Sequence, residues 1–300
     1  MNFKNITVAG SGVLGSQIAF QTAFHGFNVS VYDINEQVLE KAKERLNNLS
    51  AVYGKFFKDD QKAKEALTRF TFSSSLAEAV KDADLIIEAI PELVDIKTNF
   101  YKELSKVAPE KSVFVTNSST MIPSQFAEYT GRPEKFLALH FANQVWKNNT
   151  GEVMGHAGTD ENVTLQIIEF AKSIGMIPLH IKKEQPGYIL NSLLVPFLSA
   201  GQNLWVNGVA DPETIDKTWM LATGAPLGPF AILDIVGIQT AYNIVAAQAK
   251  ADPTPNNRFQ KQADLLKSEF LDKGKTGQGS GEGFYKYPNP AYLDPDFLKA

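Results

Sequence analysis

The chain has 300 residues, a length typical of two domains, and a formal net charge of −4 at pH 7, which gives no basic footprint for a nucleic-acid backbone. It contains no cysteine, so disulfides, iron–sulfur clusters, thiolate zinc sites and cysteine nucleophiles are excluded. The four histidines, His25, His140, His156 and His180, are not spaced as metal ligands on one helix face, and we expect neither a metal nor a nucleic-acid partner.

The first half of the chain alternates between strand-like and helix-like patterns. Short apolar runs predict strands at residues 5–9, 28–32, 85–89, 112–116 and 136–141. Helical patterns cover residues 12–26, 36–67, 76–81, 94–107 and 160–175. Strands that alternate with helices in this way predict an α/β fold with a doubly wound parallel sheet.

The second half is predicted to be helical. After about residue 185 the strand pattern disappears, and helical patterns cover residues 185–207, 211–222 and 228–250, separated by Gly and Pro. We therefore expect an α/β domain over residues 1–184 and an all-helical domain over residues 185–300.

Two observations bear on cellular location. Residues 185–210 carry no charge over a length that would cross a bilayer, but the segment contains several Asn, Ser and Gln residues. We interpret it as a buried helix or a subunit interface rather than a membrane span. An apolar strand begins near Ile6, which leaves no room for a secretory signal, and the expected location is the cytoplasm.

The sequence Gly-Ser-Gly-Val-Leu-Gly at residues 10–15 is the strongest local motif, because it follows a strand and opens a helix. The first glycine permits a tight turn, the second permits close approach of a pyrophosphate, and the third permits close helix–strand packing. The N-terminus of the helix supplies N–H groups for the phosphates. The predicted binding residues here are Gly10, Gly12, Val13, Leu14 and Gly15.

Asp33 ends the second predicted strand, 18 residues beyond the last glycine of the motif. A carboxylate at this point can accept hydrogen bonds from both ribose hydroxyls and would repel a 2′-phosphate, which favours NAD(H) over NADP(H). The alternative interpretation is a structural glycine turn followed by a surface carboxylate.

Several longer segments carry a resemblance to a known family. They are TNSST (116–120), LHFANQVWKNNTGEVMG (139–155), PGYILNSLLVPFL (186–198), GAPLGPF (224–230) and GEGFYKY (281–287). With these segments and the glycine motif, the sequence resembles the short-chain L-3-hydroxyacyl-CoA dehydrogenases, which include 3-hydroxybutyryl-CoA dehydrogenases, and most closely their diketoreductase branch. The resemblance implies a Rossmann-type NAD-binding domain, a helical C-terminal domain that forms a homodimer, and NAD-linked interconversion of a 3-hydroxyl and a 3-ketone.

The resemblance also implies a set of site residues. The family's catalytic positions fall on His140, Glu152, Ser118 and Asn191, with Ser119 as the adjacent alternative for the serine. Its cofactor contacts fall on Asp33, Glu92, Lys97, Asn117 and Asn143. The expected ligands are therefore NAD and a small-molecule substrate.

These residue types suit the implied chemistry. Histidine can take a hydroxyl proton near neutral pH, and a carboxylate on its other nitrogen fixes the tautomer and stabilises the imidazolium. Serine and asparagine can donate hydrogen bonds to the substrate oxygen as charge develops on it. Each residue also has a structural interpretation, because a histidine in the apolar run 136–141 or an asparagine among leucines is often a satisfied core residue.

The segment after His140 departs from the apolar, proline-rich pattern of the acyl-CoA members of the family. It carries Gln144, Trp146 and Lys147 instead, which puts the acyl-CoA pocket in doubt and suits a smaller or more polar ketone. The lysine-bearing residues 55–67 are either a contact for a CoA phosphate or a solvated helix face.

Three functions therefore compete. The first is a dehydrogenase of 3-hydroxyacyl-CoA, of the 3-hydroxybutyryl-CoA type. The second is an NADH-dependent reductase of free keto or diketo esters that uses the same four catalytic residues. The third is a non-catalytic dinucleotide-binding structural or sensor protein, against which the complete set of His, Glu, Ser and Asn argues.

Overall fold

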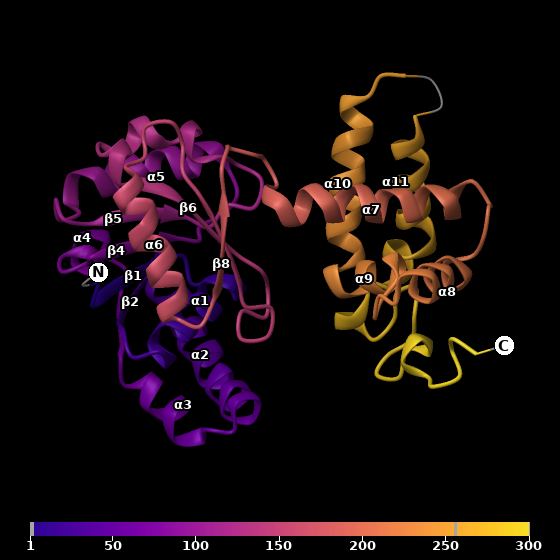
Figure 1. The fold of residues 1–300 in the computed structure, drawn as a ribbon, viewed down its shortest axis with the longest axis horizontal. Coiled ribbons are helices and arrows are strands. Elements are labelled where there is room, and N and C mark those ends of the chain that lie inside the picture. Colours follow the sequence, from indigo (N-terminus) through magenta and orange to yellow (C-terminus); the bar gives the residue numbers. More distant parts are fainter. Residues whose placement is uncertain (1–2, 255–256, 300) are drawn as a thin grey trace. The chain divides into compact units, whose positions relative to one another are not determined.

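The computed structural model describes residues 3–254 and 257–299, and the chain divides into two compact units, residues 1–191 and 192–300 (Figure 1). The predicted domain ranges, 1–184 and 185–300, meet before helix α7 (Tyr188–Val206), whereas the compact units divide just after its first turn. Residues 1–2, 255–256 and 300 of the predicted ranges lie outside the described residues.

The N-terminal unit is built on an eight-stranded sheet with the order β3-β2-β1-β4-β5-β6-β7-β8. Its strands are β1 (Asn5–Ala9), β2 (Asn28–Tyr32), β3 (Phe70–Ser73), β4 (Leu85–Glu88), β5 (Val113–Thr116), β6 (Phe136–Phe141), β7 (Thr150–Met154) and β8 (Ile177–Ile181). Neighbouring strands run parallel except β6 and β7, which are antiparallel. The predicted doubly wound α/β sheet followed by a helical domain is confirmed.

Helices connect the strands and cover both faces of the sheet (Figure 1). They are α1 (Val13–Phe24), α2 (Glu36–Phe57), α3 (Asp60–Leu67), α4 (Leu76–Val80), α5 (Val94–Val107) and α6 (Glu161–Ser173). Successive strand residues alternate between two hydrophobic cores, because side chains along a strand point to opposite faces. Val113 and Val115 of β5 pack in the core that contains residues of α1, α2 and α6, and Phe114 packs in the core that contains residues of α5.

In the N-terminal unit the structure differs from the predicted elements at three strands and one helix. Strands β3, β7 and β8 were not predicted, because β3 has only 4 residues, β7 contains a glycine and a glutamate, and β8 contains a proline. The single helix predicted over residues 36–67 is two helices. Lys58 adopts a left-handed conformation with φ of 55°, and the Asp59 side chain caps α3 by accepting from the N–H of Lys62.

The turn between β1 and α1 is as tight as its glycines suggest. Gly10 has φ of 97°, and a Cβ there would lie 2.4 Å from the carbonyl oxygen of Ala89. A Cβ on Gly15 would lie 2.0 Å from the carbonyl oxygen of Gly10. A Cβ on Gly12 would meet nothing within 4 Å, so the middle glycine faces open space. Only the two outer glycines are therefore required by the fold itself.

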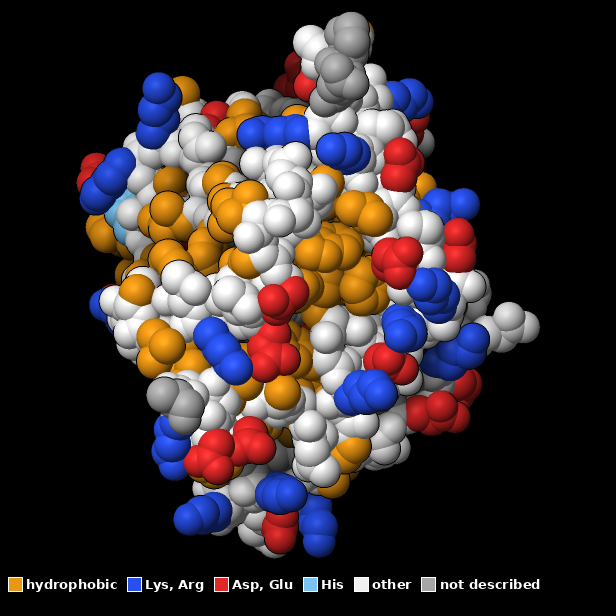
Figure 2. All heavy atoms as spheres, turned by 90° about the vertical axis from the view of Figure 1, so that its right-hand side faces the viewer, with side chains coloured by type: hydrophobic (Ala, Val, Ile, Leu, Met, Phe, Trp, Pro, Cys, Tyr) orange, Lys and Arg blue, Asp and Glu red, His pale blue; other side chains and the backbone are white. Residues whose placement is uncertain are grey.

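The C-terminal unit is helical. After α7 come α8 (Pro212–Thr223), α9 (Pro229–Val236), α10 (Ile238–Ala251) and α11 (Arg258–Glu269). The helix predicted over residues 228–250 is interrupted at Gly237, which has φ of 95°, and α11 was not predicted. Figure 2, turned toward the side of this unit, shows patches of hydrophobic side chains between charged ones.

Two buried aspartates tie the C-terminal segment to these helices. Asp216 accepts from the N–H groups of Phe230 and Ala231 and from the hydroxyl of Tyr285, at 2.8–2.9 Å. Asp234 accepts from the N–H groups of Phe284 and Tyr285, each at 2.8 Å. Burial raises the pKa of both carboxyls above the ordinary value, although these hydrogen bonds act in the opposite direction.

No single helix in the described part of the chain combines the length and the apolar character of a membrane span. Taken together, α9 and α10 have that length and composition, but they are bent by 101°.

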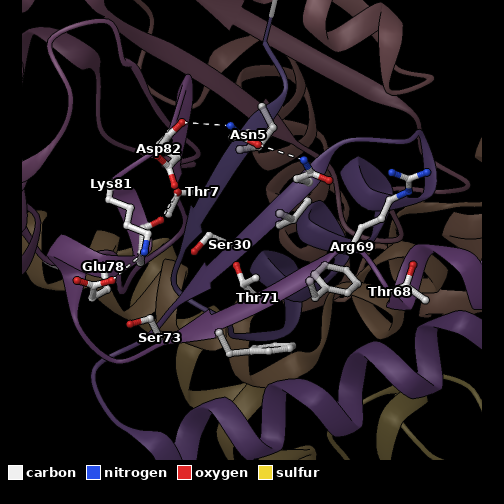
Figure 3. Close-up of a pocket in the computed structure, with 17 residues that line it drawn as sticks. Asn5, Thr7, Ser30, Thr68, Arg69, Thr71, Ser73, Glu78, Lys81 and Asp82 are labelled. Atoms are coloured by element: carbon white, nitrogen blue, oxygen red, sulfur yellow. Dashed lines mark hydrogen bonds and ion pairs between the residues drawn. The ribbon is translucent and has the colours of Figure 1, made fainter.

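A groove of about 580 Å³, lined by both polar and apolar side chains, lies over β1, β2 and β3 (Figure 3). Thr7, Ser30 and Thr71 share one register on these three adjacent strands, and Glu78 of the short α4 borders the groove. The described residues that line it include none of the predicted site residues. The groove lies along the strands, away from the turn at the carboxyl end of β1 where the glycine motif is found.

We predict that Gly15→Ala destabilises the N-terminal unit by about 2 kcal/mol or more, because the added methyl group meets a backbone carbonyl that has no room to move. Gly12→Ala, the matched control, is expected to cost less than about 1 kcal/mol. Urea unfolding of the two variants measures the difference. Equal losses would contradict the assignment of Gly15, rather than Gly12, to helix–strand packing.

Candidate active site

The antiparallel pairing of β6 with β7 brings His140 and Glu152 together. They are direct cross-strand partners, and the His140 Nδ1 lies 2.9 Å from the Glu152 Oε2. Both side chains are buried, with 5% and 2% of their residue surfaces exposed. The predicted pairing of these residues, 12 positions apart in the sequence, is therefore present as a buried hydrogen bond.

The second oxygen of Glu152 binds the start of α7. Its Oε1 accepts from the N–H groups of Ile189 at 2.9 Å and Leu190 at 3.0 Å. Burial alone would raise the pKa of the Glu152 carboxyl, but the hydrogen bonds from His140, Leu190 and Ile189 outweigh it and hold the pKa below the ordinary value. Glu152 is therefore ionised at neutral pH.

The hydroxyl next to the other nitrogen of His140 belongs to Ser119. Its Oγ lies 3.1 Å from the His140 Nε2. Ser118, the predicted catalytic serine, instead donates a short hydrogen bond to Glu92. The contact with the histidine is thus made one residue later than expected. Neighbouring residues in this extended turn point in different directions, so only one of the two serines reaches the imidazole.

Glu92 holds the segment that carries these serines. Its Oε1 accepts from the N–H groups of Ser119 and Thr120, each at 3.0 Å, and its Oε2 lies 3.3 Å from the Lys97 ammonium. Burial alone would raise the pKa of Glu92, but the hydrogen bond from Ser118 and the charge of Lys97 lower it below the ordinary value. The carboxylate is thereby a fixed anchor for the turn after β5.

Lys97 is buried between two carboxylates. Its ammonium lies 2.5 Å from the Glu88 Oε1, and both side chains are 1% exposed. The Glu88 Oε2 accepts from the hydroxyls of Tyr101 at 3.0 Å and Thr116 at 2.8 Å. A buried ion pair persists when hydrogen bonds satisfy both charges, as they do here. Lys97 and Glu92, predicted as cofactor contacts, thus belong to one network at the carboxyl ends of β4 and β5.

The three predicted asparagines lie in different places. Asn117 is buried, and its Oδ1 accepts from the N–H of Phe141 at 2.9 Å, which joins the end of β5 to the end of β6. Asn143 is exposed on the β6–β7 loop, where its carbonyl accepts from the side chain of Asn148. Asn191 is half-buried in the first turn of α7, just after the residues that Glu152 binds.

Asp33 lies at the carboxyl end of β2, as predicted, and contacts the glycine motif. Its Oδ2 accepts from the Ser11 N–H at 2.8 Å and from the Ser11 hydroxyl at 2.6 Å. Its Oδ1 accepts from the N–H of Ile34 at 2.8 Å. The carboxylate is thus held beside the glycine turn, at the position where dinucleotide-binding folds of this type carry the acid that binds the ribose.

The glycine turn fits a dinucleotide. Gly12 is the exposed N-cap of α1, it offers no side chain to cap the helix, and the space beside it is open. The N–H groups of the first helical turn, from Val13 and Leu14 onward, are therefore available to a pyrophosphate. Across the described residues no cluster of three or more His, Asp or Glu side chains is placed to hold a metal ion.

Three residues of this region, Glu88, Gln17 and Tyr188, were not predicted from the sequence. Glu88 could have been predicted, because it is a charged residue at the end of the apolar run 85–88, at the same edge of the sheet as the glycine turn. Gln17 of α1 accepts from the N–H of Gln144 at 2.7 Å and holds the β6–β7 loop, a contact with no local signature. Tyr188 stacks on the His140 ring with a left-handed backbone conformation, which no local sequence pattern predicts for a tyrosine.

Comparison with known proteins identifies the family. The model of the 3-hydroxyacyl-CoA dehydrogenase NAD binding domain matches residues 5–185, and that of the C-terminal domain of the same family matches residues 187–287. A probable 3-hydroxyacyl-CoA dehydrogenase of Caenorhabditis elegans is 35% identical, with 95% of this chain and 93% of the relative covered. A probable 3-hydroxybutyryl-CoA dehydrogenase of Bacillus subtilis is 31% identical, with 96% and 98% covered.

A solved structure of a diketoreductase, described as acting on dicarbonyl compounds, is 55% identical in sequence. It superimposes with a TM-score of 0.91 over 96% of this chain and 100% of that one. These findings confirm the predicted resemblance, the NAD-binding domain and the enzyme class. The chain belongs to the 3-hydroxyacyl-CoA dehydrogenase family of NAD-dependent oxidoreductases that act on CH–OH groups.

Proposed function

We propose that this chain interconverts a 3-hydroxy compound and its 3-keto form with NAD(H), and that His140 is the general acid/base. The observation that carries the proposal is the buried imidazole held between a carboxylate and a hydroxyl, with Nδ1 on Glu152 and Nε2 beside Ser119. This arrangement supports proton transfer at Nε2, the nitrogen not used by the carboxylate.

The protonation states follow from the hydrogen bonds. An ionised Glu152 can only accept, so Nδ1 of a neutral His140 carries the proton and Nε2 has the free lone pair. Nε2 can then take the proton of a substrate hydroxyl during oxidation and return it during reduction. Glu152 stabilises the imidazolium formed in between without itself being protonated.

The remaining groups would bind the substrate oxygen. Ser119 takes the role that the resemblance first implied for Ser118, because its hydroxyl lies where a substrate oxygen on Nε2 would accept from it. Asn191 keeps the proposed role of a second hydrogen-bond donor to the substrate oxygen. It lies in the first turn of α7, the turn whose N–H groups bind Glu152. Bound NAD supplies the acceptor or donor of the hydride.

For the substrate we propose a free keto or diketo ester. Two observations support it. One is the 55% identity to a diketoreductase. The other is the β6–β7 loop, which carries Trp146 in place of the apolar, proline-rich segment of the acyl-CoA members; the ring centroids of Trp146 and of Tyr53 on α2 are 5.6 Å apart. A 3-hydroxyacyl-CoA of the 3-hydroxybutyryl type is the second candidate, supported by the names of the more distant relatives.

The assay that tests these functions follows NADH oxidation with a β,δ-diketo ester and with acetoacetyl-CoA. We expect turnover of the ester, and a loss of about 10²–10⁴-fold in kcat in His140→Ala, because proton transfer by a positioned side chain contributes about that factor. NADH affinity, measured by fluorescence titration, should stay nearly unchanged in the variant.

Turnover of acetoacetyl-CoA alone would support the second candidate instead. Binding of NADH without turnover of either substrate would favour a non-catalytic dinucleotide-binding protein. Loss of NADH binding in His140→Ala would mean that the histidine is structural.

The two serines give a matched pair of variants. Ser119→Ala removes the hydroxyl beside Nε2, and we expect kcat to fall by about 10²-fold, the effect of losing one donor to a developing oxyanion. Ser118→Ala removes a bond to Glu92, so it should lower the melting temperature and change kcat by only a few-fold. Steady-state kinetics that rank the two variants the other way would restore Ser118 as the catalytic serine.

We also propose that the chain forms a homodimer through its helical unit. Leu193, Val209 and Leu221 of that unit are 70%, 66% and 61% exposed, and exposed apolar surface of this kind favours association. Sedimentation velocity should give about twice the chain mass of 33.0 kDa. Leu193→Arg should shift the protein toward the monomer, whereas Leu165→Arg, at a 52% exposed position on α6, should not. A wild-type monomer would contradict the proposal.

A further inference from the structure

Tyr188 begins helix α7 in a conformation that tyrosine rarely adopts. Its φ is 55°, and the preceding Gly187 has φ of 80°. A left-handed backbone is open to glycine at little cost, but it is strained for a residue with a Cβ. Tyr188 is also completely buried, at 0% exposed. A large aromatic side chain at such a position indicates that the ring itself is needed there.

The ring of Tyr188 lies on the imidazole of His140. The two ring centroids are 4.6 Å apart and the ring planes differ by 21°, which is a stacked geometry. The N–H groups of the next two residues, Ile189 and Leu190, bind the carboxylate of Glu152. One short segment therefore contacts both members of the buried pair, through a ring on one and through backbone on the other.

Stacking supplies a restraint that the hydrogen bonds of His140 do not. The N–H and the lone pair of an imidazole point along the plane of the ring, and His140 uses these two directions toward Glu152 and Ser119. Neither hydrogen bond resists tilting of the ring out of that plane as a stacked neighbour does, because hydrogen bonds tolerate a broad range of angles at the acceptor. A flat side chain against one face of the imidazole restricts this tilt.

We propose that Tyr188 is a positioning residue for the reaction, and that its ring fixes the plane of the His140 imidazole so that Nε2 points at the substrate hydroxyl. This proposal rests on the proposed role of His140 as general acid/base. The left-handed backbone is the means by which the chain turns the ring onto the histidine at the first residue of α7.

The imidazolium formed when His140 takes a proton would lie against the face of this ring, and a cation is attracted to an aromatic face. Other groups act on this pair. Glu152 binds His140 directly, and the carboxylates that face Tyr188 are Glu92, Glu88 and Glu184. The ammonium of Lys97 lies between Glu88 and Glu92. All of these side chains stay unchanged in the variants below.

The test compares Tyr188→Phe, Tyr188→Leu and Tyr188→Gly in the full-length protein. Phe keeps the ring, Leu removes the aromatic face but keeps bulk, and Gly removes the ring while it relieves the backbone strain. The readouts are kcat, KM, NADH affinity and the pH dependence of kcat/KM for alcohol oxidation. Phe170→Leu, a fully buried aromatic of α6 that does not contact His140, is the control for a general loss of core packing.

We expect Tyr188→Phe to retain kcat within about 3-fold. Tyr188→Leu and Tyr188→Gly should lose about 10-fold or more in kcat with NADH affinity unchanged, because a small misorientation of a catalytic group is costly. Their acid limb in the pH profile should move to lower pH, because loss of the aromatic face destabilises the imidazolium. Phe170→Leu should lower the melting temperature and leave the pH profile in place.

Several results would overturn the proposal. An unchanged pH profile and unchanged kcat in Tyr188→Leu would show that the ring does not orient the histidine. Restoration of wild-type kcat by Tyr188→Gly would assign the effect to backbone strain. If instead His140→Ala is fully active, the proposed function itself fails. An inactive His140→Ala beside an unaffected Tyr188→Leu rejects only the role of Tyr188.

Discussion

The reversal of one strand is the constraint on which the site depends. Seven neighbouring pairs make up the sheet, and only β6 and β7 run antiparallel. An antiparallel pair can be joined by a short loop and places its partners directly opposite one another, whereas a parallel pair needs a long crossover. His140 and Glu152 therefore meet across a hairpin, with both side chains buried in a sheet that is otherwise parallel.

The region around this pair is organised by carboxylates rather than by metal ligands or thiols. Asp33 holds the glycine turn, Glu92 holds the turn after β5, and Glu152 holds both the histidine and the start of α7. Each accepts hydrogen bonds from backbone N–H groups, and at Glu92 and Glu152 such bonds help to hold the pKa of the carboxyl below the ordinary value. The same contacts position the glycine turn, the turn after β5 and the start of α7.

Much of this arrangement was predictable from the sequence, and the failures have physical causes. The glycine turn and Asp33 could be placed because each directly follows a predicted strand. The His140–Glu152 pair was implied by the family resemblance alone, because β7, which carries Glu152, was not predicted. The choice between Ser118 and Ser119 was not predictable, because it depends on which hydroxyl an extended turn points at the imidazole. Tyr188 and Gln17 act through contacts between distant segments, and no local pattern reports such contacts.

The first residues of α7, where the two compact units meet in the sequence, contact both His140 and Glu152. Glu152 has two oxygens, and it uses one on His140 and the other on the N–H groups of Ile189 and Leu190. The compact units divide at residues 191 and 192, immediately after this contact. The first turn of α7 belongs to the N-terminal unit because a buried charge must keep its partners. A change in that turn therefore alters the hydrogen bonds of Glu152 and, through them, the orientation and charge stabilisation of His140.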